Sequence, residues 1–143
     1  MRPIKEIICT AFENLIHDFG LQVVSEGAAE VWLVGATHVI MISADIDGIN
    51  LRYVDPGTFN SFDLSLYLVV RRGGVTALPL ERSMTREEKL VHELQIDARL
   101  LSEKGSDILR GEKQWMKDYG WSPLKLNDPR DRDRVRKAVA NAS

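Results

Sequence analysis

Residues 30–54, EVWLVGATHVIMISADIDGINLRYV, are the stretch of this chain that decides its fold. Val, Ile, Trp and Met dominate residues 30–36 and 37–44, a composition typical of β-strands. Residues 45–48, Asp-Ile-Asp-Gly, predict a hairpin turn of the Asp-Gly type, after which residues 49–53 alternate apolar with polar side chains. Connections this short favour an antiparallel meander, because parallel neighbours need a crossover of about a dozen residues or more.

Two further strands are predicted on either side of this stretch. Residues 21–25 alternate in part, and the Glu-Gly-Ala-Ala of residues 26–29 is typical of a turn. The Asp-Pro-Gly of residues 55–57 is a second turn signal, and residues 64–70 then carry Leu or Val at every second position. The sequence therefore predicts a sheet of roughly five antiparallel strands.

A helix is predicted before the sheet, over residues 4–19. Apolar residues recur there at steps of three and four with charged residues between them, which indicates a helix with one buried face. Pro3 suits the first turn of such a helix, and Gly20 suits the left-handed position just past its end.

Further helices are predicted after the sheet. Thr85 and Glu88 form a capping-box pattern, and the amphipathic helix that they begin should end near Gly105. A weaker helical segment covers residues 106–119. The predicted class is α+β: an N-terminal helix, an antiparallel meander, and C-terminal helices packed on one face. Because the middle strands are apolar on both faces, we expect either that the C-terminal helices also cover the second face or that a second copy pairs there as a homodimer.

The C-terminal segment differs in composition from the rest of the 143 residues. We expect one α+β domain over residues 1–121 and a charged tail or frayed helix over residues 122–143. Residues 130–137 hold four Arg and one Lys against two Asp, a local charge of +3. The interleaved aspartates would weaken phosphate contacts, so this run favours a solvated helix over a nucleic-acid-binding arm.

Composition narrows the function classes further. With 19 Lys and Arg against 21 Asp and Glu, the formal net charge of −2 gives no reason to expect nucleic acid or an anionic membrane as a partner. No stretch approaches the ~20 apolar residues of a membrane-spanning helix. The single cysteine, Cys9, permits no internal disulfide. We therefore expect a cytoplasmic protein that does not bind membranes.

The sequence carries no recognisable catalytic or metal-binding pattern. His17, His38 and His92 are far apart, and no His-x-x-x-His or Cys-x-x-Cys pair occurs. Cys9 and His17 lie eight residues apart on the same predicted helix, which separates them by roughly 12 Å along its axis. We therefore expect no catalytic residue, no metal site and no cofactor.

An aromatic cluster near the C-terminus is the main candidate for partner binding. Trp115 and Tyr119 are four residues apart, so they share one side of a helix, and Trp121 follows. Large aromatic side chains are either core anchors or interface hot spots, and both interpretations stay open. The candidate interface has these three residues at its centre and Arg110 and Arg71 as its polar rim.

A small-ligand binder or an enzyme is the alternative hypothesis. Its pocket would lie between the sheet and the helix that begins after Thr85. His38, Asp45, Arg52 and Tyr53 are the candidate lining residues, because side chains on strands can converge in such a pocket.

Two segments carry a resemblance to other proteins. Phe19-Gly20-Leu21 after the first helix, and the Leu-Leu-Ser-Glu-Lys-Gly-Ser-Asp-Ile-Leu-Arg-Gly of residues 100–111 followed by Trp115, resemble a group of small bacterial α+β proteins, many of them uncharacterised. Some of that group are similar to immunity proteins of contact-dependent or polymorphic toxin systems. Glu112 departs from the group's pattern, which has Asp after the glycine. The resemblance implies a bacterial cytosolic domain that binds another protein and catalyses no reaction, such as an immunity or antitoxin-like factor.

Overall fold

Six antiparallel strands form one sheet, in the same order along the sheet as along the chain. The computed structural model describes residues 2–45, 48–74 and 84–143. The strands are β1 Gln22–Ser25, β2 Glu30–Val34, β3 Val39–Asp45, β4 Gly48–Val54, β5 Asn60–Asp63 and β6 Leu124–Lys125. The helices are α1 Ile4–Ala11, α2 Glu13–Asp18, α3 Leu64–Val70, α4 Arg86–Lys104, α5 Ser106–Leu109, the 3-10 helix η1 Gln114–Asp118, and α6 Pro129–Ala142. The predicted α+β class with an antiparallel sheet is confirmed, although the sheet has six strands.

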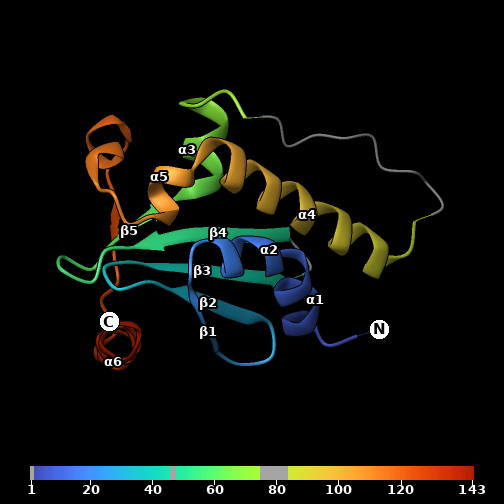
Figure 1. Ribbon diagram of the computed structural model, residues 1–143, viewed down its shortest axis with the longest axis horizontal. Helices are drawn as coiled ribbons and strands as arrows, with labels where there is room; N and C mark the ends of the chain where they lie inside the picture. The colour runs from blue at the N-terminus through green and yellow to red at the C-terminus, as the bar shows by residue number, and fades with distance from the viewer. Residues whose placement is uncertain (1, 46–47, 75–83) are drawn as a thin grey trace.

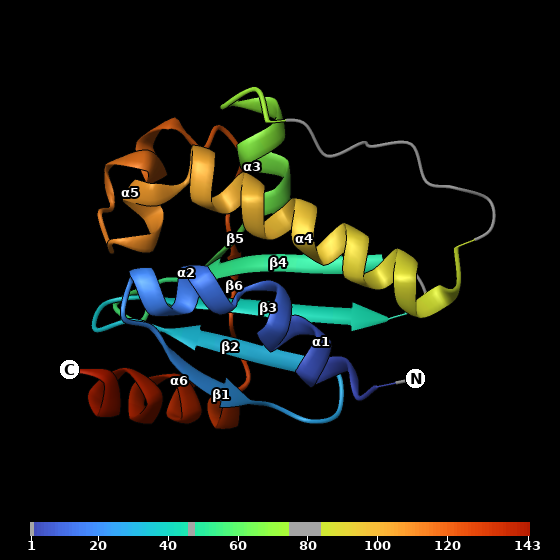
Figure 2. The same ribbon diagram turned by 45° about the vertical axis from the view of Figure 1, so that its right-hand side comes forward.

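Both faces of the sheet are buried. Alternation along β2 directs Val31 and Leu33 into one apolar core, while Trp32 and Val34 enter another on the opposite face. Figure 1 and Figure 2 show helices α1 to α5 on one side of the sheet and α6 alone on the other. We call the core beneath α1 to α5 the main core and the core beneath α6 the second core.

The predicted strand over residues 64–70 is wrong, because this segment is helix α3. The side chain of Asp63 accepts a hydrogen bond from the backbone N–H of Leu66 at 3.0 Å and so caps the helix. Leu64, Tyr67 and Leu68 are buried, a spacing of three and four that is helical. The alternation of leucines in this segment is equally compatible with a strand. The sheet is completed by β5 and β6 and not by residues 64–70.

The observed helix boundaries lie close to the capping and glycine signals in the sequence. The predicted N-terminal helix is interrupted at the buried Phe12 and so forms α1 and α2. The Thr85 hydroxyl caps α4 by accepting from the N–H of Glu88 at 3.1 Å, and α4 ends before Gly105, as predicted. The segment 106–119 is split at Gly111, whose φ of +87° lies in the left-handed region.

The charged C-terminal segment contains helix α6, which packs on the sheet. Asp128 caps the helix through the N–H of Arg130 at 2.9 Å. Val135 and Ala138 are buried in the second core, and the guanidinium groups of Arg132 and Arg136 lie 4.8 and 4.9 Å from the centre of the Phe59 ring. A C-terminal helix therefore covers the second face of the sheet. Of the helices described, none is both long enough and apolar enough to cross a bilayer.

We expect Val135→Asp to destabilise the fold by about 3 kcal/mol or more, because it places an unpaired carboxylate in the fully buried second core. Urea unfolding followed by tryptophan fluorescence would measure the loss. Ala140→Asp, on the exposed side of the same helix, is the control and should cost well under half as much. Equal effects of both variants would show that the docking of α6 contributes little to stability.

Candidate functional site

The predicted interface aromatics Trp115 and Tyr119 lie in the main core, where they are 3% and 5% exposed. The Trp115 ring centre is 4.9 Å from that of Tyr53 and 5.0 Å from that of Phe62, both with edge-to-face geometry. The Tyr119 hydroxyl accepts a hydrogen bond from the N–H of Asp63 at 2.8 Å. These two side chains therefore join η1 to the sheet and to the start of α3.

Trp121 and Arg71 are the two members of the predicted interface that meet at the surface. Trp121 is 37% exposed, and its ring packs on Tyr119 at 5.3 Å between ring centres. The Arg71 guanidinium lies 5.3 Å from the Trp121 ring centre, an arrangement typical of a cation–π contact. Gly120 leaves room for it, since a Cβ at that position would lie 2.0 Å from an Arg71 nitrogen. Arg110, the remaining predicted rim residue, is exposed and pairs with Glu112 at 2.8 Å.

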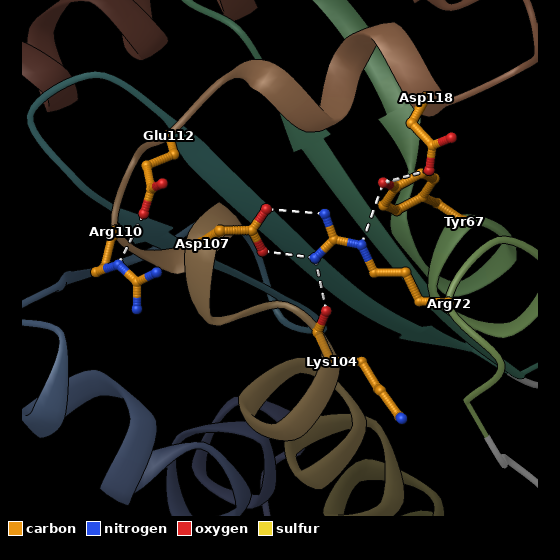
Figure 3. Close-up of polar contacts among 7 residues, drawn as sticks. All are labelled: Tyr67, Arg72, Lys104, Asp107, Arg110, Glu112 and Asp118. Atoms are coloured by element: carbon orange, nitrogen blue, oxygen red, sulfur yellow. Dashed lines mark hydrogen bonds and ion pairs between the residues drawn. The ribbon is translucent and has the colours of Figure 1, made fainter.

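Arg72, next to Arg71, holds the ends of several helices together (Figure 3). Its guanidinium donates to both carboxylate oxygens of Asp107, at 2.5 and 2.8 Å, and to the backbone carbonyl of Lys104 at 2.7 Å. It also donates to the Tyr67 hydroxyl at 3.1 Å, which in turn donates to Asp118. Hydrogen bonding raises the pKa of Arg72 and lowers that of Asp107, so both groups stay charged. The network ties the end of α3 to α4, α5 and η1.

His38 and Tyr53, two of the predicted pocket residues, stack with their ring centres 5.8 Å apart. Both are buried, and burial together with the nearby Lys113 charge lowers the pKa of His38 to about 4. Burial also raises the pKa of Tyr53, with a smaller contribution from Asp55. Both rings are therefore uncharged at neutral pH.

Lys113 contacts the sheet just before the start of β3 and at the end of β4. Its ammonium donates to the carbonyl of Thr37 at 2.8 Å, and to the Tyr53 hydroxyl and the Asp55 carboxylate at 3.3 Å each. Sequence reasoning missed Lys113, because its partners are 58 or more residues away along the chain.

The other two predicted pocket residues lie elsewhere. Arg52 points to the opposite face of β4 from Tyr53, and its Nε donates to the Ser61 hydroxyl at 2.8 Å. Asp45 is the last residue of β3, whereas His38 directly precedes that strand. The structure therefore places His38 with Tyr53 and separates both from Asp45 and Arg52.

Cys9, the single cysteine, lies on α1 and is partly buried. Burial raises the pKa of the Cys9 thiol, which keeps it protonated and weakly nucleophilic at neutral pH. Within residues 2–45, 48–74 and 84–143, no three His, Cys, Asp or Glu side chains are placed to hold a metal ion together.

An open groove of about 450 Å³ lies between α3, α4 and the start of β4, and we call it the α3–α4 groove. Its lining residues are Ile49 from β4, Ser65, Leu66, Val69 and Val70 from α3, and Glu93, Ile96 and Asp97 from α4. Leu66 and Val70, one helical turn apart, are 38% and 58% exposed. The groove lies between the sheet and α4, where the alternative hypothesis expected a pocket, but none of the four expected residues lines it.

Among the lining residues that the structure describes, the charged ones are two carboxylates from α4. Glu93 and Asp97 are one turn apart on α4, and no hydrogen-bond or ion-pair partner for either is found among the residues that the structure describes. Burial raises the pKa of Asp97 to about 6, and the charge of Glu93 adds to the shift. A like-charge pair at this spacing disfavours a helix, and it was the one sequence signal that could have indicated this site.

We expect Trp115→Ala to lower the free energy of unfolding by about 3–5 kcal/mol, because it removes a buried indole at the centre of the main core. Chemical denaturation followed by circular dichroism would measure the change. Trp121→Ala, at the partly exposed neighbour, should cost less than about 1 kcal/mol. A Trp115→Ala protein as stable as the wild type would contradict the core role of this residue.

A pH effect is expected from His38. Its pKa is about 6.5 when unfolded and about 4 when folded, so the unfolded chain binds more protons between these values. His38 should therefore cause stability to fall as the pH drops from 6.5 to 4, by up to roughly 3 kcal/mol. Urea unfolding across this range should show a smaller fall for His38→Phe, which keeps a ring against Tyr53 but does not titrate. Parallel pH profiles for the two proteins would refute this assignment.

Comparison with known proteins assigns no family to this geometry. No protein-family model, no curated protein and no solved structure matches the chain. The function must therefore be argued from the contacts, charges and exposed side chains of the molecule itself.

Proposed function

We propose that this chain is a non-catalytic protein-binding domain whose partner docks on the α3–α4 groove. The observation that carries the proposal is the exposure of Leu66 and Val70 on the rim of an open groove that also contains Ile49, Val69 and Ile96. Exposed apolar surface that borders a groove is typical of protein interaction sites. Trp121 and Arg71, which are not among the residues that line the groove, form a separate exposed pair of residue types that are enriched in such sites.

The attachment of α3 to the protein also supports this role. Leu64, Tyr67 and Leu68 anchor its inner side in the main core, and Arg72 ties its end to Asp107. The outer side of α3 is therefore presented on a supported element, which reduces the ordering that a partner must impose on binding.

The alternative of a small-ligand pocket has less support. His38 and Tyr53 are packed inside the core, while Asp45 and Arg52 lie apart from them. The more specific hypothesis of an immunity or antitoxin-like factor concerns the identity of the partner, and it stays a prediction from the resemblance in the sequence.

Site-specific cross-linking in the cell of origin would test the proposal. We expect Leu66→p-benzoylphenylalanine to yield one cross-linked species of defined added mass upon irradiation, because position 66 lies on the rim of the groove. Adding Val70→Gln should abolish that species, since it removes exposed apolar surface while keeping a good helix-forming residue.

The control probe is Glu103→p-benzoylphenylalanine, at an exposed position on α4 outside the groove. The groove is not the docking site if the control probe yields the same cross-linked species, or if Val70→Gln leaves the yield of cross-linking from position 66 unchanged.

A further inference from the structure

The α3–α4 groove combines an apolar lining with two carboxylates. Ile49, Val69 and Ile96 come from three different elements and supply apolar surface, and Leu66 and Val70 extend it onto the exposed side of α3. Glu93 and Asp97 line the same groove from α4. The described side chains from β4 and α3 that line it carry no charge, and no ion-pair partner for either carboxylate is found within residues 2–45, 48–74 and 84–143.

The surroundings of Asp97 in the isolated domain disfavour the ionised form of its carboxyl group. Its carboxyl group is partly buried, it lies one turn from a second carboxylate, and its raised pKa reports that ionisation is disfavoured there. At neutral pH the group is nevertheless mostly ionised, since a pKa of about 6 lies below 7. A cationic group entering the groove would relieve the repulsion between the two carboxylates and would pair with Asp97 in a partly desolvated site.

We propose that the α3–α4 groove binds a segment of a partner protein that presents apolar side chains together with lysine or arginine, as an amphipathic basic helix does. This inference rests on the proposed function and adds the chemistry of the partner to it. The volume of about 450 Å³ accommodates a few side chains, which matches the anchors of one helical segment. The apolar anchors would cover Leu66 and Val70, and the cation would reach Glu93 and Asp97.

Three fluorescein-labelled helical peptides would test the inference by fluorescence anisotropy against the full chain. The first alternates leucines at helical spacing with lysines, the second replaces each lysine by glutamate, and the third replaces each leucine by serine. We expect only the leucine–lysine peptide to bind. Asp97→Asn and Glu93→Gln should each weaken its binding by about tenfold, and the double variant Leu66→Gln with Val70→Gln should weaken it at least as much.

Two features separate a loss of binding from a loss of folding. Asp97→Asn removes a disfavoured charge, so this variant should have a higher Tm than the wild type while binding the peptide more weakly. Glu103→Gln removes a carboxylate from an exposed part of the same helix, outside the groove, and should leave the affinity unchanged.

The remaining outcomes distinguish the inference from the proposed function. Equal binding of the leucine–glutamate peptide, still sensitive to Leu66→Gln with Val70→Gln, would overturn the charge preference and leave the docking function standing. Equal binding of the serine–lysine peptide would overturn the apolar part of the inference. Binding of the leucine–lysine peptide that none of the groove variants changes would overturn both proposals.

Two other occupants of the groove would also overturn the inference. A native mass of two chains that Leu66→Gln with Val70→Gln reduces to one chain would identify a second copy as the occupant. Peptide binding that occurs only after residues 75–83 are replaced by a Gly-Ser linker would identify the chain's own segment.

Discussion

The burial of both faces of the central strands is the constraint on which the rest of the structure depends. β2 and β3 place apolar side chains alternately on the two sides of the sheet, so neither side can remain in water without a large cost. Helices α1 to α5 cover one side, and the chain then passes through β6 to bring α6 to the other. A helix rich in arginine can do this because Val135 and Ala138 face the sheet, while Arg132 and Arg136 lay their guanidinium groups on Phe59.

Arg72 and Lys113 both join distant parts of the chain through their hydrogen bonds. Arg72 uses its donors on Asp107, Lys104 and Tyr67, and Lys113 uses its ammonium group on Thr37, Tyr53 and Asp55. These contacts hold together segments that are far apart in sequence. They are polar links at the margins of an aromatic core, where a cation can pair with a carboxylate or a carbonyl without complete loss of solvation.

The two carboxylates of the α3–α4 groove differ from these groups. Arg72 and Lys113 have their partners within the domain, whereas Asp97 and Glu93 share a groove with apolar side chains and with each other. Burial and the charge of Glu93 disfavour the ionised form of Asp97, and a complementary cation from a partner would remove that cost. The exposed side of α3 and the acidic turn of α4 are therefore best understood as parts of one surface.

Local sequence signals determined a large share of the fold. Short connections between apolar alternating segments implied the antiparallel meander, and Thr85 with Glu88 and Gly105 marked both ends of α4, because turns and caps depend on neighbouring residues. Tertiary structure decided what those signals left open. Residues 64–70 satisfied both the helical and the strand period, and the Asp63 cap together with burial against the main core selected the helix. Trp115 could have been a core or an interface residue until its contacts with Tyr53 and Phe62 placed it inside. A pocket between the sheet and α4 was an alternative hypothesis from the sequence, but its lining was not predicted, because Ile49, Val70 and Asp97 come together only when three separate elements pack.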